Sequence, residues 1–200
     1  MHKFKTAATL TLIPMITAIL LFSGCSTTRA VEKPSGPPTV ADLFPLQQGN
    51  SWAYNYIDYQ GGKEQRILVT TRVTRRDGKL VELKSGDNII NYRDDDLGVF
   101  KTQSRYYLLM SPVIEGKKWP LAGENGEVRI SRTAQTVETP GGIFKNCVVV
   151  TEEIFGVSKV EWTYAPKVGP VKMKIFSLNA DGEKLMAEGS LRAFQIAGAN

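Results

Sequence analysis

Apolar and polar residues alternate with a period of two along most of the chain after residue 50. In the segment QRILVTTRVTRR, Ile67, Val69 and Val73 share one side of the alternation, and Arg66 and Arg72 share the other. Successive side chains of a β-strand point to opposite faces of the sheet, so this pattern predicts a strand with one buried face. Similar short runs follow one another toward the C-terminus.

Turn-forming residues separate these runs at intervals of about 8–12 residues, which is typical of an antiparallel sandwich or barrel. Asp77-Gly78 is the strongest hairpin signal, and its residue types predict a type I′ turn. No amphipathic helix is identified. The last segment, EKLMAEGSLRAF, contains good helix formers, but Gly189 interrupts it and it is predicted to be a strand. The expected fold is an all-β antiparallel meander that forms a sandwich or an open barrel.

Two segments share one eight-residue frame, PLQQGNSW at 45–52 and PVIEGKKW at 112–119. In each frame a proline ends an extended approach, a glycine permits a tight turn, and a tryptophan follows as the first large inward residue of the next strand. We therefore expect Trp52 and Trp119 to be structural anchors, with Trp162 as a third. The repeat favours two related β-units, Pro45–Met110 and Pro112–Phe194. Chance repetition of a turn–strand start is the alternative.

Three runs, RYYLLM, CVVV and IFSL, are apolar at consecutive positions, so both faces of these strands must meet apolar surroundings. Either a second layer covers one face, or that face lines a cavity for a ligand. Because no helix is expected to close a concave sheet face, the sequence favours a closed core. It accordingly predicts that the soluble part, residues 26–200, binds no lipid.

The chain begins with MHKFK, the apolar run TAATLTLIPMITAILLF and then SGC, which is the plan of a secretory signal. The segment from Leu21 to Cys25 resembles the lipobox of bacterial lipoproteins, whose cysteine is acylated. The resemblance implies a signal peptide at 1–24, a lipidated Cys25 (palmitate is one expected chain) with a flexible tether at 25–40, and one β domain at 41–200. The alternative is an uncleaved membrane anchor with an incidental cysteine.

The same resemblance bears on location. Ser26 follows the cysteine in place of the aspartate associated with retention at the inner membrane. This favours the outer membrane, with the protein facing the periplasm. Several acyl chains on one cysteine would anchor the protein firmly, whereas a single chain binds a membrane only marginally.

Composition excludes several classes of function. His2, the single histidine, lies in the leader with Lys3 and Lys5, so the mature chain would carry 23 basic and 20 acidic residues. A net charge of +3 is too small to predict nucleic-acid binding. A chain without histidine is also poorly suited to zinc, copper or iron. We therefore expect no nucleic-acid partner, no metal and no cofactor.

No pattern of catalytic residues emerges. With Cys25 acylated, Cys147 has no disulfide partner, and its setting NCVVV predicts a thiol buried in a strand. Glu152 and Glu153 are adjacent in a predicted strand, so they point to opposite faces and cannot act as a pair. Asp94-Asp95-Asp96 lacks the spacing of a calcium loop and is predicted to be a solvated turn. The sequence therefore favours a protein that is not an enzyme.

Basic residues crowd the first predicted hairpin. They are Arg66, Arg72, Arg75, Arg76 and Lys79. They could form a contact face for acidic lipid head groups or a partner protein. Alternatively they cover a solvated sheet face and protect its edge from aggregation. The sequence favours the second interpretation.

Four segments, FPLQQGNSWAY, EGKKWPL, TPGGIFKNCVVV and YAPKVGPVKM, together resemble a family of uncharacterised bacterial lipoproteins. The resemblance covers most of residues 43–175 and implies no activity or catalytic residues. Combined with the leader, it predicts a lipid-anchored envelope protein that acts by binding or scaffolding, with the membrane and another envelope protein as partners. A carrier of an acyl chain or other apolar ligand is the alternative, and a hydrolytic enzyme is the weakest candidate.

Overall fold

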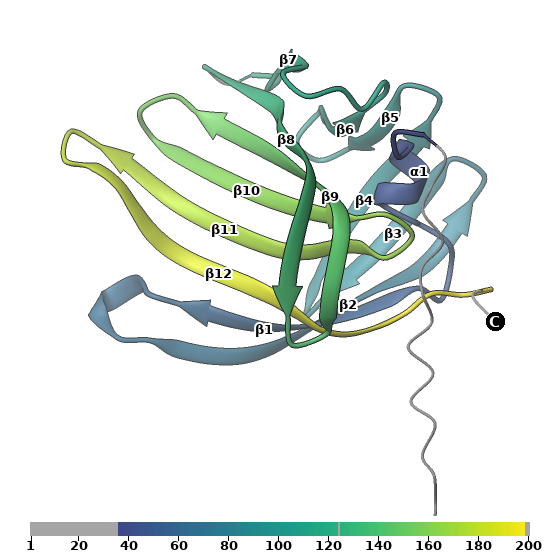
Figure 1. The fold of residues 1–200 in the computed structure, drawn as a ribbon, viewed down its shortest axis with the longest axis horizontal. Helices are drawn as coiled ribbons and strands as arrows, with labels where there is room; N and C mark the ends of the chain where they lie inside the picture. Colours follow the sequence, from purple (N-terminus) through teal and green to yellow (C-terminus); the bar gives the residue numbers. More distant parts are fainter. Residues whose placement is uncertain (1–35, 124, 199–200) are drawn as a thin grey trace, which may run out of the picture. The chain divides into compact units, whose positions relative to one another are not determined.

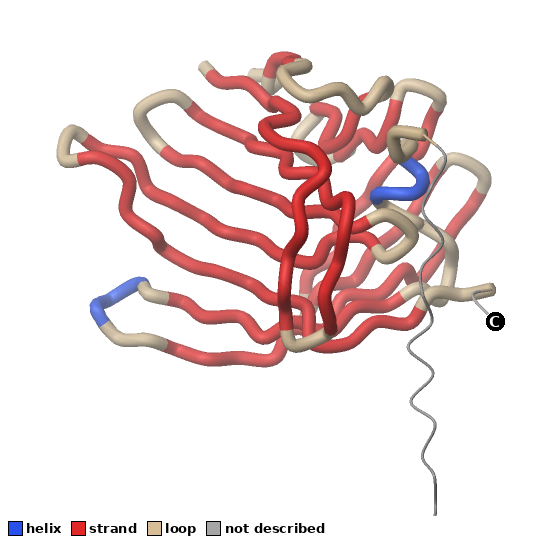
Figure 2. Tube along the Cα trace, in the orientation of Figure 1, coloured by secondary structure: helices blue, strands red, loops and turns tan. Residues whose placement is uncertain are grey.

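The computed structural model describes residues 36–123 and 125–198, which form one twelve-stranded antiparallel sheet (Figures 1 and 2). The predicted signal peptide and Cys25 lie outside the described residues. The elements are α1 (Val40–Leu43), β1 (Ser51–Asp58), η1 (Gln60–Gly62), β2 (Gln65–Asp77), β3 (Leu80–Ser85), β4 (Asn88–Asp95), β5 (Gly98–Lys101), β6 (Tyr106–Met110), β7 (Lys118–Pro120), β8 (Gly126–Thr139), β9 (Gly142–Ile154), β10 (Ser158–Ala165), β11 (Gly169–Asn179) and β12 (Gly182–Gln195).

The sheet consists of two meanders of six strands each. Its order is β6-β5-β4-β3-β2-β1-β12-β11-β10-β9-β8-β7, so β1 and β12 join the meanders at the centre. The first meander contains β1–β6 and the second β7–β12, which matches the boundaries of the two units expected from the repeated frame. Both meanders run in the same order across the sheet, with β1 and β7 in corresponding positions.

The sheet curls until its two edge strands approach each other. β6 and β7 share no backbone ladder, but the indole Nε1 of Trp119 on β7 donates a hydrogen bond to the carbonyl oxygen of Tyr107 on β6 at 2.6 Å. The result is an antiparallel barrel that is nearly closed, which confirms the expected fold class. The last segment is a strand, β12, as predicted.

One turn differs from its prediction. Asp77 pairs with Leu80, so the β2–β3 turn is centred on Gly78 and Lys79, one residue later than expected. Gly78 has a φ of +57°, but Asp77 and Lys79 are not among the residues with positive φ. A type I′ turn needs positive φ at both central residues, so the predicted turn type is wrong.

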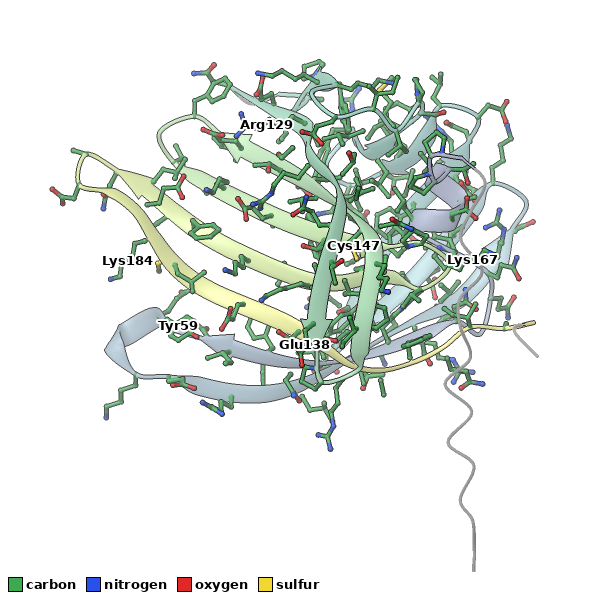
Figure 3. The ribbon with its side chains drawn as sticks, in the orientation of Figure 1. Tyr59, Arg129, Glu138, Cys147, Lys167 and Lys184 are labelled. Atoms are coloured by element: carbon green, nitrogen blue, oxygen red, sulfur yellow. The ribbon has the colours of Figure 1, made fainter. Side chains whose placement is uncertain are left out.

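The two ends of the barrel differ. The β2–β3, β4–β5 and β10–β11 turns lie with α1 at one end, here called the closed end, at the right of Figure 1. α1 contacts β5, β10 and β11 there, and the backbone nitrogen of Lys167 (Figure 3) donates to the carbonyl of Asp42 at 2.7 Å. The turns that follow odd-numbered strands form the open end, and no helix in the described part of the chain covers it. Tyr59 and Lys184 mark that end in Figure 3.

The sequence analysis missed α1. Thr39 Oγ1 accepts from the Asp42 backbone nitrogen, and the Asp42 carboxylate accepts from the Thr39 backbone nitrogen, which is a capping box. Val40, which was assigned to the tether, is buried in the core with Leu43 and Phe44. The folded domain therefore begins slightly before residue 41. Within the described residues, no helix is long and apolar enough to span a membrane.

The β8–β9 hairpin folds back on the sheet. Breaks in register along the pair bend it, and the backbone nitrogen of Gly141 at its tip donates to the carbonyl of Leu191 on β12 at 2.9 Å. All four residues of Cys147–Val150 are buried, so both faces of β9 are covered there. For this run, the prediction of apolar surroundings on both faces is confirmed.

Candidate functional site

The barrel interior contains an apolar cavity of about 190 Å³. This volume is smaller than the roughly 300–1,000 Å³ typical of small-molecule sites, and the cavity opens to solvent at its mouth. The residues that line it come from both meanders and from the segment after α1. They are Phe44, Trp52, Tyr54, Tyr56, Val69, Thr71, Leu83, Ser85, Ile90, Tyr92, Leu108, Trp162, Tyr164, Pro170, Lys172, Met173 and Gly189.

Strand alternation and one glycine create this space. Trp52, Tyr54 and Tyr56 are spaced by two on β1, so they share the inward face. Gly189 on β12 lies opposite Tyr56 in the ladder. A Cβ at Gly189 would lie 3.6 Å from a Tyr56 ring carbon, so a larger side chain there would project into the cavity. The missing side chain at this position keeps the inner face hollow.

Aromatic rings close the cavity at the closed end. The Phe44 ring centroid lies 5.9 Å from that of Trp52 and 5.7 Å from that of Tyr92. It also lies 5.9 Å from the ring centroid of Tyr164, where the β10 wall meets the closed end. Trp52 Nε1 donates to the carbonyl of Val168 at 2.6 Å, and Tyr54 Oη donates to the carbonyl of Pro170 at 2.9 Å. Both polar atoms are therefore satisfied by backbone.

The wall on β10 is different. Trp162 Nε1 and the Tyr164 hydroxyl are buried and have no hydrogen-bond partner among the described residues. The Trp162 indole lies near enough to the Glu152 carboxyl to favour its charged form, but it makes no hydrogen bond of normal geometry. Burial raises the pKa of Tyr164 well above its ordinary value, and the charge of Glu152 raises it further.

Glu152 points into the barrel from β9. Its Oε2 accepts a hydrogen bond from the Tyr106 hydroxyl on β6 at 2.5 Å. Burial raises the pKa of Glu152, and the hydrogen bond from Tyr106 opposes that shift. Both residues also line a second, more polar pocket of about 430 Å³ with Ser104, Leu121 and Ser158. The pair lines this second pocket and not the apolar cavity, and Glu152 approaches the cavity only through its proximity to Trp162.

Glu152 was not predicted as a site residue, because adjacent carboxylates on opposite faces of a strand cannot act as a catalytic pair. Glu152 and Glu153 do point to opposite faces, as argued, and Glu153 approaches Arg129 outside at 3.8 Å. What places Glu152 in the site is Tyr106, 46 residues away in the chain. That contact forms only because the sheet closes, so no pattern in the sequence around either residue predicts it.

The expected closed core is found only in part, because a buried cluster fills much of the barrel but leaves a small cavity. The sheet curls into a barrel whose interior is incompletely filled, and α1 with Phe44 covers one end of it. The inference failed because it required a long amphipathic helix to close a concave face. Here a helix of four residues covers one end, the curl of the sheet forms the side wall, and the other end stays open.

The three predicted tryptophan anchors differ in burial. Trp52 and Trp119 are 1% and 7% exposed and belong to the core. Trp162 is partly exposed and lines the cavity. Cys147 (Figure 3) is fully buried, and burial raises the pKa of its thiol to about 11, which leaves it protonated and a poor nucleophile.

The predicted basic face carries many carboxylate partners. Arg66 approaches Glu64 at 2.5 Å, and Arg76 approaches Asp94 at 2.8 Å. Arg75 and Lys79 make longer contacts with Asp77 and Asp96, at 3.4 and 3.5 Å. Arg72 is exposed. These partners neutralise much of the positive charge, which supports the interpretation of a solvated sheet face.

The acidic turn shows no arrangement for a metal. Asp95 accepts from Arg93 Nε at 2.8 Å and from the Leu97 backbone nitrogen at 3.0 Å, so its oxygens hold the β4–β5 turn. Asp96 is exposed. No cluster of three metal-ligating side chains occurs in the described residues.

No protein-family model and no curated protein matches the chain. Two solved bacterial structures are similar in fold. One is from Bacteroides fragilis NCTC 9343 and is called an exported protein with a YmcC-like fold. It is 15% identical over 77% of this chain and 99% of that chain, with a TM-score of 0.42. The other, called a lipoprotein, is from Parabacteroides distasonis ATCC 8503. It is 12% identical over 76% of this chain and 98% of that chain, with a TM-score of 0.46.

Proposed function

We propose that the protein is a lipid-anchored component of the bacterial cell envelope that binds an apolar ligand of the acyl-chain class inside its barrel. The cavity carries this proposal. Aromatic and aliphatic side chains line most of it, and its polar groups are few, as is typical of small-molecule sites. The lipoprotein signal and Cys25 support the location. The outer membrane is the proposed destination, with the protein facing the periplasm.

Binding by the cavity takes the place of the scaffold role favoured by the sequence. The scaffold preference depended on a closed core, whereas this interior presents apolar surface that a ligand could cover. Removing apolar surface from water contributes roughly 25 cal/mol per Å². An acyl chain that entered through the open mouth of the cavity would gain this stabilisation.

We propose that the cavity binds its ligand without catalysing a reaction. Nucleophilic catalysis needs a nucleophile within hydrogen-bond reach of a base. Cys147 is buried with a raised pKa, and its Sγ contacts the backbone carbonyl of Phe144 at 3.5 Å. Glu152 is engaged by the Tyr106 hydroxyl. Neither group is arranged to attack a ligand in the apolar cavity.

Tryptophan quenching tests the proposal on the full-length lipoprotein, extracted from cells and held in amphipol. The probe is a dibrominated acyl chain, offered as its methyl ester and as its free acid, because bromine quenches indole emission at short range. Trp52 and Trp162 line the cavity and Trp119 does not. We expect saturable quenching, a smaller quenched fraction in Trp162→Phe and a larger one in Trp119→Phe.

A pocket-filling variant provides the control. Gly189→Leu should abolish quenching, because its side chain would enter the cavity. Ser190→Leu adds the same side chain at the next position, which faces the other side of β12, and should leave quenching intact. Circular dichroism would verify that both variants fold. The proposal would be contradicted if neither probe quenched the wild type, or if Gly189→Leu were quenched as strongly as the wild type.

The anchor has a separate test. Labelled palmitate should be incorporated into the wild type and not into Cys25→Ala, which should also retain its signal peptide. Membrane fractionation should recover the wild type with the outer membrane. Label that persists in Cys25→Ala would refute lipidation at this residue.

A further inference from the structure

The polar atoms that line the cavity fall into satisfied and unsatisfied groups. Thr71 Oγ1 and Ser85 Oγ bond each other at 2.8 Å, and Trp52 and Tyr54 donate to backbone carbonyls. The Tyr164 side chain, by contrast, is 0% exposed, and its hydroxyl has no partner in the described part of the molecule. Buried polar groups in native proteins nearly always have a partner, so an unpartnered hydroxyl beside a cavity requires an explanation.

The surroundings of the hydroxyl restrict what could bind it. Trp162 lies two residues away on β10, so its indole N–H and the Tyr164 hydroxyl share the inward face. Tyr54, Tyr92, Tyr106 and Glu152 are the titratable groups near Tyr164, and the three tyrosines are neutral because burial raises their pKa values. The Trp162 N–H lies near the Glu152 carboxyl, whereas the Tyr164 hydroxyl has no acceptor in the described residues. The Tyr164 hydroxyl therefore calls for a ligand that carries an acceptor oxygen.

The charge of the site argues against an anionic acceptor. Glu152 is an acid, and an anion bound beside it would meet like charge at short range. The cation at the cavity edge is Lys172. It pairs with Thr163 and Ser190 in the ladders, which places its side chain on the outer face, where it lines a groove with Glu138 and Glu161. Lys101 lies over the Tyr106 ring, 5.9 Å from its centroid, and its charge lowers the pKa of Glu152.

We propose, building on the proposed function, that the cavity selects an esterified acyl chain over a free fatty acid. The ester carbonyl would accept a hydrogen bond from the Tyr164 hydroxyl, with the Trp162 N–H directed to the same region. The hydrocarbon chain would extend toward Val69, Ile90 and Met173, and the Glu152 carboxylate would exclude a charged head. An ester satisfies the unpartnered donor without placing a negative charge beside the Glu152 carboxyl.

The test compares two probes on the full-length lipoprotein in amphipol at neutral pH. Dissociation constants of the dibrominated methyl ester and of the corresponding free acid are measured by tryptophan quenching. We expect the dissociation constant of the ester to be about tenfold lower than that of the acid. A factor of this size corresponds to the gain or loss of one hydrogen bond or one charge contact. Tyr164→Phe should weaken ester binding several-fold and leave acid binding unchanged. Tyr107→Phe, whose hydroxyl already contacts Asp95 outside the cavity, should change neither constant.

The charge is tested independently of Tyr164. Glu152→Gln keeps an acceptor for Tyr106 but removes the charge, so it should strengthen binding of the free acid about tenfold and erase the preference for the ester. Glu153→Gln removes the neighbouring charge on the outer face and should leave the preference intact. Equal binding of both probes, tighter binding of the acid, or an unaltered ester constant in Tyr164→Phe would overturn the inference and leave the proposed function standing. Failure of both probes to bind would instead refute the proposed function.

Discussion

The closed end of the barrel and the β10 wall of its cavity are built from the same kinds of residue and treat polar atoms differently. At the closed end, the indole of Trp52 and the hydroxyl of Tyr54 both donate to backbone carbonyls of the β10–β11 region. On the wall, the indole of Trp162 and the hydroxyl of Tyr164 donate to nothing in the described residues. One tryptophan–tyrosine pair has complete hydrogen bonding and the other does not.

This difference separates a stabilising region from a binding region. A buried donor that lacks a partner costs about 1–3 kcal/mol, so a region that serves stability alone gains by satisfying every donor. The closed end does so, and it adds the capped helix α1 and the ring contacts of Phe44. The wall retains unmatched donors beside an apolar cavity, which is expected of a surface that a ligand completes.

The largest expected effect comes from the two cavity tryptophans. Trp52→Ala should lower the free energy of unfolding by about 3–5 kcal/mol, because it removes a 1% exposed side chain and a hydrogen bond. Trp162→Ala should cost clearly less, since Trp162 is partly exposed and makes no hydrogen bond. Urea unfolding of a secreted form of residues 26–200 measures both. Equal losses would remove the distinction between the two regions.

Two glycines give the next test. Gly169 at the closed end has a φ of +107°, and a Cβ there would lie 2.9 Å from Trp52 Nε1. Gly169→Ala should therefore destabilise the fold by roughly 1–3 kcal/mol. Gly189 on the cavity side has ordinary space for a Cβ, so Gly189→Ala should be neutral or stabilising by up to about 1 kcal/mol. Urea midpoints of the two variants measure the change in unfolding free energy. A loss of stability in Gly189→Ala as large as that in Gly169→Ala would contradict the difference between the two regions.

The closed end shows what the sequence could predict. Alternation predicted the strands, and the inward position of Trp52 followed from the turn that precedes it. α1 was missed although Thr39-Val40-Ala41-Asp42 carries a capping-box signal. The search was for an apolar stripe, and a helix of one turn is too short to show one. The capping residues were the informative pattern.

The cavity shows what the sequence could not predict. Whether apolar faces meet each other or leave a space depends on how far the sheet curls, and this follows from the pairing of β1 with β12 and the approach of β6 to β7. The contact between Tyr106 and Glu152 depends on the same closure. Gly189 was noted only as an interruption of a helical pattern. Its role in leaving space opposite Tyr56 requires the register of β12, which is set by residues far away in the chain.

A smaller effect is expected from the helix cap. Thr39→Ala removes the oxygen that accepts from the Asp42 backbone nitrogen and should cost about 1 kcal/mol of unfolding free energy. Thr39→Ser retains that oxygen and should be close to the wild type. Urea midpoints of the two variants measure the difference. A Thr39→Ala variant as stable as Thr39→Ser would show that α1 closes the barrel by apolar contacts alone.

The smallest difference is the most direct test of the two regions. Tyr54→Phe leaves the Pro170 carbonyl without its donor and should cost about 1 kcal/mol. Tyr164→Phe removes a hydroxyl that has no partner, so it should leave the unfolding free energy unchanged or raise it slightly. The two substitutions delete the same atom from rings in the same barrel, so their difference reports the hydrogen bonding and little else. If Tyr164→Phe proved the more destabilising, its hydroxyl would have a partner in the free protein, such as an ordered water, and the wall would no longer offer an unmatched donor to a ligand.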